Sequence, residues 1–518
     1  MNAIARRFAA LLPAITLLMT ACASLPAPQP HATTPAAALL QDTTLARIAA
    51  DSTPPAKRSL TGLRLLASGD HAFDARLALA RHAERTLDAQ YYLLADDAAG
   101  RRFLQALHEA AQRGVRVRLL LDDLHSADVA APLAELARHE RVQVRLFNPL
   151  PVRSGGPLTR LLLSPNDFEQ LNRRMHNKLF IADGHVAISG GRNIADEYFM
   201  QASAANFVDM DLLLTGAALA PLAEVFERYW DSAQSYPLQR LQTAATAPST
   251  AAEHLALAVP PGRPLPQPAA QDVLGQTPVS DELAQGHLGL LFAPVQVMVD
   301  SPDKVTQPPA LDNSALGKGL LRLRQAQSEV VIVSPYFIPG VRGMAMLREA
   351  TAARVRVSVL TNSMAATDEP VVHHAYARYR EAMLDMGVTL HELSPQLARK
   401  AAVFGDFRSS DGRLHAKVAL ADRRWVLMGS MNMDGRSAYA NTELGLLIDS
   451  PELAWQLRGL LQRAHASSSY RLRRTGHGIE WVVRDGSAEQ VRTSEPGVDL
   501  ALRLKTSLLA LFVDEQLL

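Results

Sequence analysis

The strongest constraint on the fold of this chain is a pattern of polar residues that occurs twice in the sequence. Each copy contains a histidine, a lysine two positions later, an aspartate, and an asparagine that follows a turn of small residues. The first copy is His176, Lys178, Asp183 and Asn193, and the second is His415, Lys417, Asp422 and Asn432. The two copies are offset by 239 residues at every position, which chance does not explain. The chain therefore carries two related halves.

Two stretches rich in alanine, proline and threonine separate these halves from each other and from the N-terminus. Such composition is typical of tethers and linkers. At 518 residues the chain is also too long for one compact core, which favours two large domains. The expected division is a signal segment (1–22), a tether (23–59), an N-terminal domain (60–242), a linker (243–285), a C-terminal domain (286–469) and a C-terminal extension (470–518).

Each half also begins with the same series of secondary structure elements. In the first half, residues 86–94 read as a strand, 101–113 as an amphipathic helix and 115–121 as a short apolar strand. In the second half the corresponding elements are a strand at 330–336, a helix at 344–353 and a strand at 355–361. Strands that alternate with helices of this length predict an α/β fold around mostly parallel or mixed sheets.

The repeated residues are suited to chemistry on a phosphodiester. A histidine and a lysine two positions apart on a strand point to the same face, and the asparagine after the small turn can reach the same pocket. Two such halves place two imidazoles on opposite sides of one phosphorus atom. One histidine can then attack the phosphorus, while the other protonates the leaving alkoxide and later deprotonates the acceptor. The side chains expected to bind the phosphate oxygens are Lys178, Asn193, Lys417 and Asn432.

A nucleophilic histidine needs an acceptor on its other ring nitrogen to hold the correct tautomer. Asp209 and Glu443 follow the asparagines and are the predicted orienting carboxylates, with Asp211 a close alternative to Asp209. Asp183 and Asp422 complete the catalytic motif, although their place at strand ends favours a structural role. The chain has no cluster of histidine, cysteine and carboxylate residues with metal-ligand spacing, so we expect no metal and no cofactor.

These residues resemble the phospholipase D superfamily, whose members carry this histidine–lysine–aspartate motif twice. Residues 171–178, 190–199 and 366–380 are similar to its cardiolipin synthase C branch, and so is the tail after residue 470. The resemblance implies two tandem α/β/α sandwich domains, packed with pseudo-two-fold symmetry around one shared active site. It also implies transfer of a phosphatidyl group from one phospholipid, with phosphatidylethanolamine as donor, onto phosphatidylglycerol to give cardiolipin.

The resemblance further implies roles for the two histidines, with one departure from the family pattern. It points to His176 as the nucleophile that forms a phosphohistidine and to His415 as the general acid and base; the sequence alone leaves these roles interchangeable. The second glycine of the small turn is replaced by Ser430 in the second half.

The N-terminus predicts export. Arg6 and Arg7 precede an apolar run at residues 8–19, and Thr20 and Ala21 lead to Cys22, the only cysteine of the chain. This order is typical of a secretory signal and resembles a bacterial lipoprotein signal, in which Cys22 would be lipidated. A plain signal peptide and an uncleaved anchor are the alternatives. The expected location is the periplasmic face of a membrane, and Ala23 after the cysteine favours the outer over the inner membrane.

A predicted helix face around His373 and the C-terminal segment each allow two interpretations. His373, Tyr376 and Arg380 share one face of a predicted helix, where His373 is a candidate for the lipid headgroup site, although inward packing explains the spacing equally well. Residues 498–518 predict an amphipathic helix, which fits either a membrane interface or, slightly better, packing on its own domain.

Several competing functions remain at this stage. A phospholipase D hydrolase would use the same histidines with water as acceptor and release phosphatidic acid. A nuclease or other phosphodiesterase fits less well, because a net charge of +1 gives no basic excess for nucleic acid. A surface lipoprotein with a decayed site is disfavoured because both motifs are complete. The expected partners are phospholipids and the membrane surface, with no nucleic acid and no obligatory protein partner.

Overall fold

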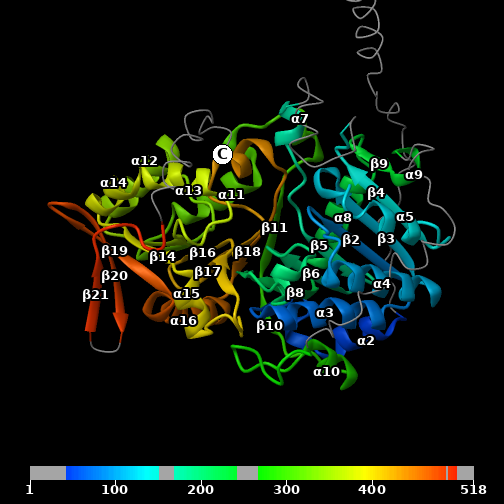
Figure 1. Ribbon diagram of the computed structural model, residues 1–518. Helices are drawn as coiled ribbons and strands as arrows, with labels where there is room; N and C mark the ends of the chain where they lie inside the picture. Colours follow the sequence, from blue (N-terminus) through cyan, green and yellow to red (C-terminus); the bar gives the residue numbers. More distant parts are fainter. Residues whose placement is uncertain (1–41, 151–167, 242–266, 486–487, 499–518) are drawn as a thin grey trace, which may run out of the picture.

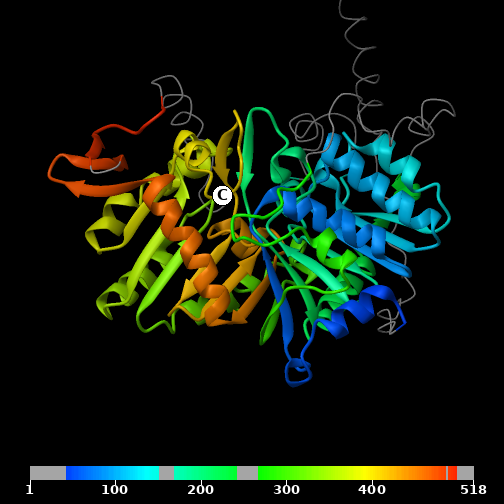
Figure 2. The ribbon, with the colours of Figure 1, turned by 90° about the horizontal axis from the view of Figure 1, so that it is seen from below.

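The computed structural model describes residues 42–150, 168–241, 267–485 and 488–498. It contains two large mixed β-sheets that lie side by side, each with helices packed against it (Figure 1). Figure 2 shows the same two halves from below. The predicted α/β class with two repeated units is therefore confirmed.

The first sheet has nine strands in the order β10-β1-β8-β6-β5-β2-β3-β4-β9. Their bounds are β1 (Thr61–Leu66), β2 (Thr86–Tyr91), β3 (Arg116–Asp122), β4 (Val142–Phe147), β5 (Leu179–Ala182), β6 (Val186–Gly190), β8 (Asp211–Gly216), β9 (Ser235–Pro237) and β10 (Leu291–Ala293). The helices of this part are α2 (Thr44–Asp51), α3 (Gly69–His82), α4 (Ala98–Gln112), α5 (Ala130–Leu136), α7 (Phe168–Asn172), α8 (Leu219–Trp230), α9 (Leu238–Leu241) and α10 (Val279–Ala284).

The second sheet has ten strands in the order β11-β18-β17-β16-β12-β13-β14-β19-β20-β21. Their bounds are β11 (Val295–Val299), β12 (Glu329–Val333), β13 (Arg356–Asn362), β14 (Thr389–Leu393), β16 (Val418–Ala421), β17 (Trp425–Gly429), β18 (Leu444–Asp449), β19 (Ser469–Thr475), β20 (Gly478–Asp485) and β21 (Ala488–Arg492). The α-helices are α11 (Ala315–Leu323), α12 (Gly340–Ala352), α13 (Pro370–Ala377), α14 (Arg380–Asp385), α15 (Pro395–Ala401) and α16 (Pro451–Ser467), and a π-helical turn spans Arg436–Ala440.

The alternating apolar pattern of β3 explains why it lies inside the first sheet. Val117, Leu119 and Leu121 belong to one buried cluster, while Leu120 belongs to another, because successive side chains point to opposite faces of a strand. The second of these clusters also contains residues of the other half, such as Leu414. A continuous apolar core therefore joins the halves and fixes their relative position.

The sheets do not follow the expected domain boundaries strictly. β10 comes after residue 285 yet pairs with β1 in the first sheet, and the chain enters the second sheet at β11. β19, β20 and β21, which begin the C-terminal extension, continue the second sheet at its edge. The domain limits as such stay predictions. Within the described ranges, no helix combines the length and apolar character needed to cross a membrane.

Backbone pairing across the two halves brings the repeated motifs together. β7 (Ala205–Val208) of the first half forms a parallel pair with β15 (Asp411–Leu414) of the second. An isolated parallel bridge joins Met175 to Thr442 in the corresponding place. His415 follows β15 directly and His176 follows Met175. Each histidine is therefore held by main-chain contacts to the opposite half.

The motif aspartates lie at tight turns, away from the imidazoles. Asp183 has a φ of 49° and its carboxylate accepts hydrogen bonds from the main-chain N–H groups of Glu84, Arg85 and Thr86, at 3.0, 2.8 and 2.9 Å. Asp422 has a φ of 53° and accepts in the same way from residues 327–329 before β12. Each carboxylate thus bonds the turn of the hairpin that follows its motif lysine to the start of the neighbouring strand. This is a structural role.

This arrangement predicts that Asp183→Ala destabilises the fold without removing a reacting group. Asp183 is 1% exposed, so its loss leaves three main-chain donors without their acceptor and should lower the free energy of unfolding by on the order of 3 kcal/mol. Asp183→Asn, which keeps one acceptor oxygen, should lose less. Urea unfolding measures both. Unchanged stability together with lost turnover in Asp183→Ala would instead place this carboxylate in the chemistry.

Candidate active site

The first histidine is held by a carboxylate of the second half. Nδ1 of His176 lies 3.2 and 3.1 Å from the two carboxylate oxygens of Glu443, whose side chain is fully buried. Ser430 also donates a hydrogen bond to Glu443, and Ser437 donates another at 2.7 Å. Glu443 therefore has its oxygens occupied by three donors, which fixes the imidazole ring of His176 with Nδ1 protonated and Nε2 free to react.

The second histidine is held in a similar way, although Nζ of Lys417 also lies 3.0 Å from its Nδ1. Nδ1 of His415 lies 2.6 Å from Oδ2 of Asp209, a carboxylate of the first half that is 1% exposed. The main-chain N–H of Met210 donates to the other oxygen of Asp209 at 2.7 Å. On the reactive side, Nε2 of His415 lies 3.5 Å from the hydroxyl of Tyr198.

The crossed partnership follows from the backbone pairing between the halves. The N–H of His415 donates to the carbonyl of Val208 at 2.8 Å, so the residue after Val208, which is Asp209, lies beside the imidazole. The N–H of His176 donates to the carbonyl of Thr442 at 2.9 Å, which places Glu443 in the same way. Neither half holds its own histidine, so a complete site requires both halves.

The two motif lysines lie in the same buried space. Nζ of Lys178 donates to the carbonyl of His176, and Nζ of Lys417 to the carbonyl of His415, both at 2.6 Å. Burial lowers the pKa of Lys178 to about 7 and that of Lys417 to about 8. An ammonium group that has lost much of its hydration binds an anionic phosphate strongly, because the phosphate replaces the missing solvation.

The charges of the imidazoles follow from the same burial. Burial and the charge of Lys178 lower the pKa of His176 to about 4, although Glu443 acts against this. Burial and Lys417 hold the pKa of His415 well below its usual value, and the charge of His176 lowers it further. Both rings are therefore neutral at physiological pH in the empty site, and the charge of a bound phosphodiester would favour protonation of one of them.

The carboxylates differ in a way that distinguishes the two histidines. Burial raises the pKa of Glu443, but its contacts with His176, Lys178 and Ser430 outweigh this and hold the pKa below its usual value. For Asp209, burial outweighs the charge of Lys417, so its pKa is raised. The two histidines therefore have partners in different electrostatic environments.

The two motif asparagines at the border of the site differ in their hydrogen bonds. Nδ2 of Asn193 donates to the hydroxyl of Tyr198 at 3.0 Å, and its Oδ1 accepts from the N–H of Leu93 at 3.3 Å. Asn432 is held through its main-chain N–H, which donates to Ser437 at 2.9 Å. Its buried Oδ1 accepts no hydrogen bond from the part of the chain that the structure describes. Asn432 is therefore the asparagine with an unused polar atom for substrate.

The small turn explains the serine that departs from the repeat. A Cβ on Gly191 would lie 2.1 Å from Oδ1 of Asp209, so a side chain there would displace the orienting carboxylate. Its counterpart Ser430 tolerates a side chain because its hydroxyl bonds to Glu443. The hydroxyl of Ser430 therefore stabilises the position of Glu443 instead of displacing it.

The structure also separates Asp209 from its alternative. Asp211 accepts from Arg76 at 3.0 Å and from the N–H of Arg192 at 3.2 Å, within a fully buried ion-pair network that contacts neither histidine. Asp209, two residues earlier in the chain, is the residue that contacts His415. Both Asp209 and Glu443 lie just before β8 and β18 rather than on these strands.

His373 lies in a different environment from the one expected for a headgroup residue. It is 4% exposed, and its Nε2 lies 2.9 Å from Glu495 and 2.6 Å from Arg380. Arg380 also donates to Glu392 at 2.7 Å and to Glu495 at 2.6 Å. The two carboxylates and the imidazole could hold a cation by their spacing, but the guanidinium already occupies their ligand atoms. This cluster ties α13 and α14 to the tail, which is the packing alternative.

Two tyrosines belong to the site although the sequence pattern did not single them out as catalytic candidates. The ring of Tyr92 meets the ring of His176 edge-on with centroids 5.2 Å apart, and Nζ of Lys178 lies 5.5 Å from the Tyr92 centroid. Tyr198 meets His415 in the same way at 5.1 Å. Nothing in the spacing of the motif marks these residues. Cys22 and residues 499–518 lie outside the described residues.

The chain is similar to known proteins in sequence and in fold. A family model described as "Cardiolipin synthase, PLD-like domain" matches residues 77–230 and 320–464. The chain is 37% identical to cardiolipin synthase C of Escherichia coli (strain K12), over 88% of this chain and 96% of that protein. It is 28% identical to cardiolipin synthase A of Pseudomonas fluorescens, over 78% of this chain and 69% of that protein. Among solved structures, phosphatidylserine synthase of Haemophilus influenzae Rd KW20 aligns with a TM-score of 0.58 at 14% identity, covering 89% of this chain and 98% of that one.

Two tandem α/β units that share one site with paired histidines and lysines define an enzyme of the phospholipase D type, and its activity is transfer of a phosphatidyl group between phospholipids. The chain belongs to the cardiolipin synthase family of phospholipase D-like proteins.

The lysine environment predicts a specific pH dependence of kcat/KM, which reports the groups of the free enzyme. Lys178 binds phosphate only when charged, so kcat/KM should fall as the pH rises through about 7. On the acid side, His176 loses its nucleophilic lone pair as the pH falls through about 4. Lys178→Arg keeps its charge at high pH. It should therefore move the alkaline limb up towards about 8, where Lys417 titrates, even if the maximal rate drops.

Steady-state rates on short-chain lipid between pH 4 and 9 would test this, with Lys57→Arg on an exposed 3-10 turn as the control. An alkaline limb that stays in place in Lys178→Arg would contradict the assignment of Lys178 as the titrating group.

Proposed function

We propose that this enzyme makes cardiolipin, with phosphatidylethanolamine as the phosphatidyl donor and phosphatidylglycerol as the acceptor, through a phosphohistidine intermediate. The observation that carries the proposal is the pair of crossed carboxylate–histidine contacts, Glu443 with His176 and Asp209 with His415. Two oriented imidazoles beside two ammonium groups supply what a two-step exchange at phosphorus needs, namely a nucleophile, an acid and base, and charge stabilisation.

In the first step, Nε2 of His176 attacks the phosphorus of the donor. The bond between phosphorus and the headgroup oxygen breaks, and protonated His415 gives its proton to the leaving alkoxide. In the second step, neutral His415 takes the proton of the acceptor hydroxyl, the new oxygen–phosphorus bond forms, and the nitrogen–phosphorus bond breaks. Lys178 and Lys417 stabilise the charge on the non-bridging oxygens in both steps.

His176 is the better candidate for the nucleophile for an electrostatic reason. Its partner Glu443 has a lowered pKa and stays ionised, which supports the positive charge that develops on the ring during attack. Burial instead raises the pKa of Asp209, so the partners of the two histidines are not equivalent. The family resemblance points the same way.

The surroundings of His415 support a donor with a cationic headgroup. Burial lowers the pKa of both His415 and Lys417, and the negative charge of Asp368, which accepts a hydrogen bond from the hydroxyl of Tyr336 at 2.8 Å, acts against this lowering. Glu197 and Glu369 also lie near Asp368, and burial together with the charge of Asp368 raises the pKa of each. Arg413 near Glu197 and Arg436 near Glu369 act against this increase. The ammonium of ethanolamine fits such an acidic rim better than the glycerol of phosphatidylglycerol does.

We also propose that the enzyme acts at the periplasmic face of a membrane, anchored by a lipidated Cys22. The apolar run at residues 8–19 and the small residues before Cys22 support this, and Ala23 favours the outer membrane. The near-neutral net charge of +1 gives no reason to expect nucleic acid as a substrate.

Lipid products identify the reaction. Purified protein in vesicles of phosphatidylglycerol and labelled phosphatidylethanolamine should form cardiolipin that carries the labelled phosphatidyl group and should release ethanolamine. His176→Ala and His415→Ala should each lower the rate by at least about a thousandfold, since each removes a reacting group. Lys318→Ala, on the exposed side of α11, should match wild type.

Other products would contradict particular parts of the proposal. Phosphatidic acid as the sole product would mean that water is the acceptor and the enzyme is a hydrolase. Equal cardiolipin formation without phosphatidylethanolamine would overturn the choice of donor. Full activity in either histidine variant would overturn the two-histidine mechanism.

A further inference from the structure

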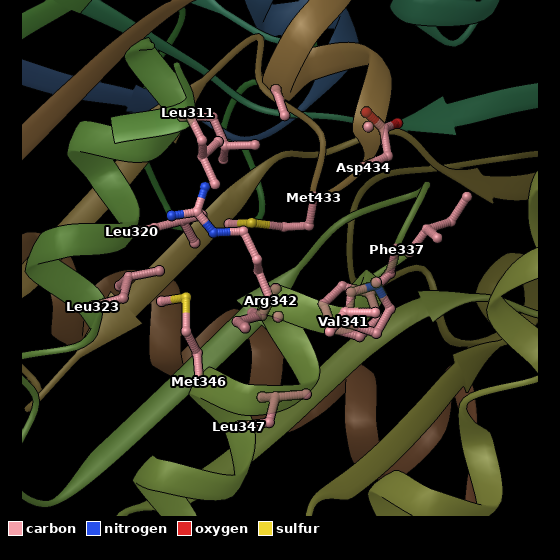
Figure 3. Close-up of a pocket in the computed structure, with 18 of the residues that line it drawn as sticks. Leu311, Leu320, Leu323, Phe337, Val341, Arg342, Met346, Leu347, Met433 and Asp434 are labelled. Atoms are coloured by element: carbon pink, nitrogen blue, oxygen red, sulfur yellow. The ribbon is translucent and has the colours of Figure 1, made fainter. Parts of the chain in front are cut away.

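A large apolar cavity lies in the second half, outside the catalytic residues. Its volume is about 850 Å³, within the range of about 300–1,000 Å³ that small-molecule ligand pockets occupy. Leu320 and Leu323 of α11 face Met346 and Leu347 of α12 across it, and Met433 from the segment after β17 closes one side (Figure 3). Most of the lining is apolar, with Arg324, Arg342 and Asp434 as its charged members, and this composition favours a ligand with a large hydrocarbon part.

The first half provides an internal comparison for this space. The parallel bridge between Leu94 and Ile194 corresponds to the bridge between Phe337 and Met433, so equivalent residues can be counted from these pairs. By this register α4 corresponds to α12. The helix that packs beside α4 is α3, with 14 residues, while α11 in the same place beside α12 has only 9.

In the first half, aromatic rings fill the corresponding space. Phe199 stacks on Phe73 with centroids 4.6 Å apart, and Phe103 is fully buried in the same core. Counted from the bridges, the counterpart of Phe199 is Ala438 and the counterpart of Phe103 is Met346, both of which line the cavity. The second half thus lacks the rings that close this space in the first, which is the difference expected if the space holds a ligand.

The mouth of the cavity is apolar and open to solvent. Val341 is 89% exposed and Tyr439 is 42% exposed, and both line the cavity. The guanidinium groups of Arg324 and Arg342 lie at the rim, where each pairs with an exposed carboxylate at 2.9 and 3.6 Å. An exposed apolar opening with paired charges beside it is suited to contact with a lipid surface.

The cavity shares a wall with the active site. Met433 and Asp434 directly follow Asn432, and Ser437, which donates to Glu443, lies in the π-helical turn that also supplies Ala438 and Tyr439 to the cavity. A group bound in the cavity is therefore separated from the residues that orient His176 only by the backbone segment that carries Met433, Asp434 and Ser437.

We propose that this cavity binds one acyl chain of a phospholipid substrate while the headgroup lies between the two histidines. The inference rests on the proposed function, since it takes phospholipid as the substrate. The cavity then anchors long-chain lipid and contributes to KM, and it makes no contact with the reacting atoms. Its apolar lining selects hydrocarbon length and not headgroup chemistry.

The first test fills the cavity and leaves the catalytic residues unchanged. Leu320→Trp should raise KM for long-chain phospholipid at least about tenfold, because it removes the burial of two or more methylene groups. It should leave kcat and the rate on a short-chain lipid near wild type. Leu321→Trp, the neighbouring exposed position on the same helix, is the matched control and should change neither. Thermal unfolding of both variants shows whether they fold.

The second test measures binding directly and does not depend on turnover. Wild-type protein is mixed with vesicles of phosphatidylglycerol and phosphatidylethanolamine that contain an analogue with a photoreactive group near the end of one acyl chain. After illumination, mass spectrometry should find the label on peptides of α11 and α12, and Leu320→Trp should remove it. Label elsewhere, or on the control and the filled variant alike, would overturn the cavity proposal.

The two tests separate failure of the inference from failure of the proposed function. An enzyme that makes cardiolipin but leaves the cavity unlabelled, with no effect of Leu320→Trp on KM, refutes only the acyl-chain site. Labelling of the cavity in a protein that makes no phosphatidyl product refutes the proposed reaction and keeps the lipid site.

Discussion

The site depends on one type of contact, a buried carboxylate of one half bonded to the histidine of the other. Glu443 holds His176 and Asp209 holds His415, and neither carboxylate reaches the histidine of its own half. The strand pair β7–β15 and the bridge between Met175 and Thr442 make this crossing a property of the backbone. The duplicated fold therefore forms one indivisible site, in which separation of the halves would break both carboxylate–histidine contacts.

The internal symmetry is broken where chemistry requires it. The nucleophile and the acid have different tasks, and the structure gives the two histidines unequal surroundings. Glu443 is held below its usual pKa by its contacts, including Ser430, whereas the pKa of Asp209 is raised by burial. The replacement of a glycine by Ser430 is thus part of the difference between the two halves. The same divergence opens the apolar cavity beside α12, where the first half packs phenylalanine rings.

Much of this arrangement can be predicted from the sequence, because the repeat fixes it. The offset of 239 residues identifies two units, and the alternation of strands and helices gives the class of fold. The motif also brings His176, Lys178, His415 and Lys417 to one place. The crossing of Asp209 and Glu443 could not be read from the chain, since it comes from pairing between residues more than 200 positions apart. The contact of Tyr198 with His415 could not be predicted for the same reason, and the sequence left the role of His373 open because its partner Glu495 lies far along the chain.

The crossed contacts can be measured directly by NMR of histidine-labelled protein, in which ring nitrogen shifts report the tautomer and the hydrogen bond at Nδ1. The signals are assigned from His176→Ala and His415→Ala. Glu443→Gln should shift the Nδ1 signal of His176 and leave that of His415 nearly unchanged, and Asp209→Asn should do the reverse. If each carboxylate variant instead perturbed the histidine of its own half, the central claim that the two halves complete each other would be wrong.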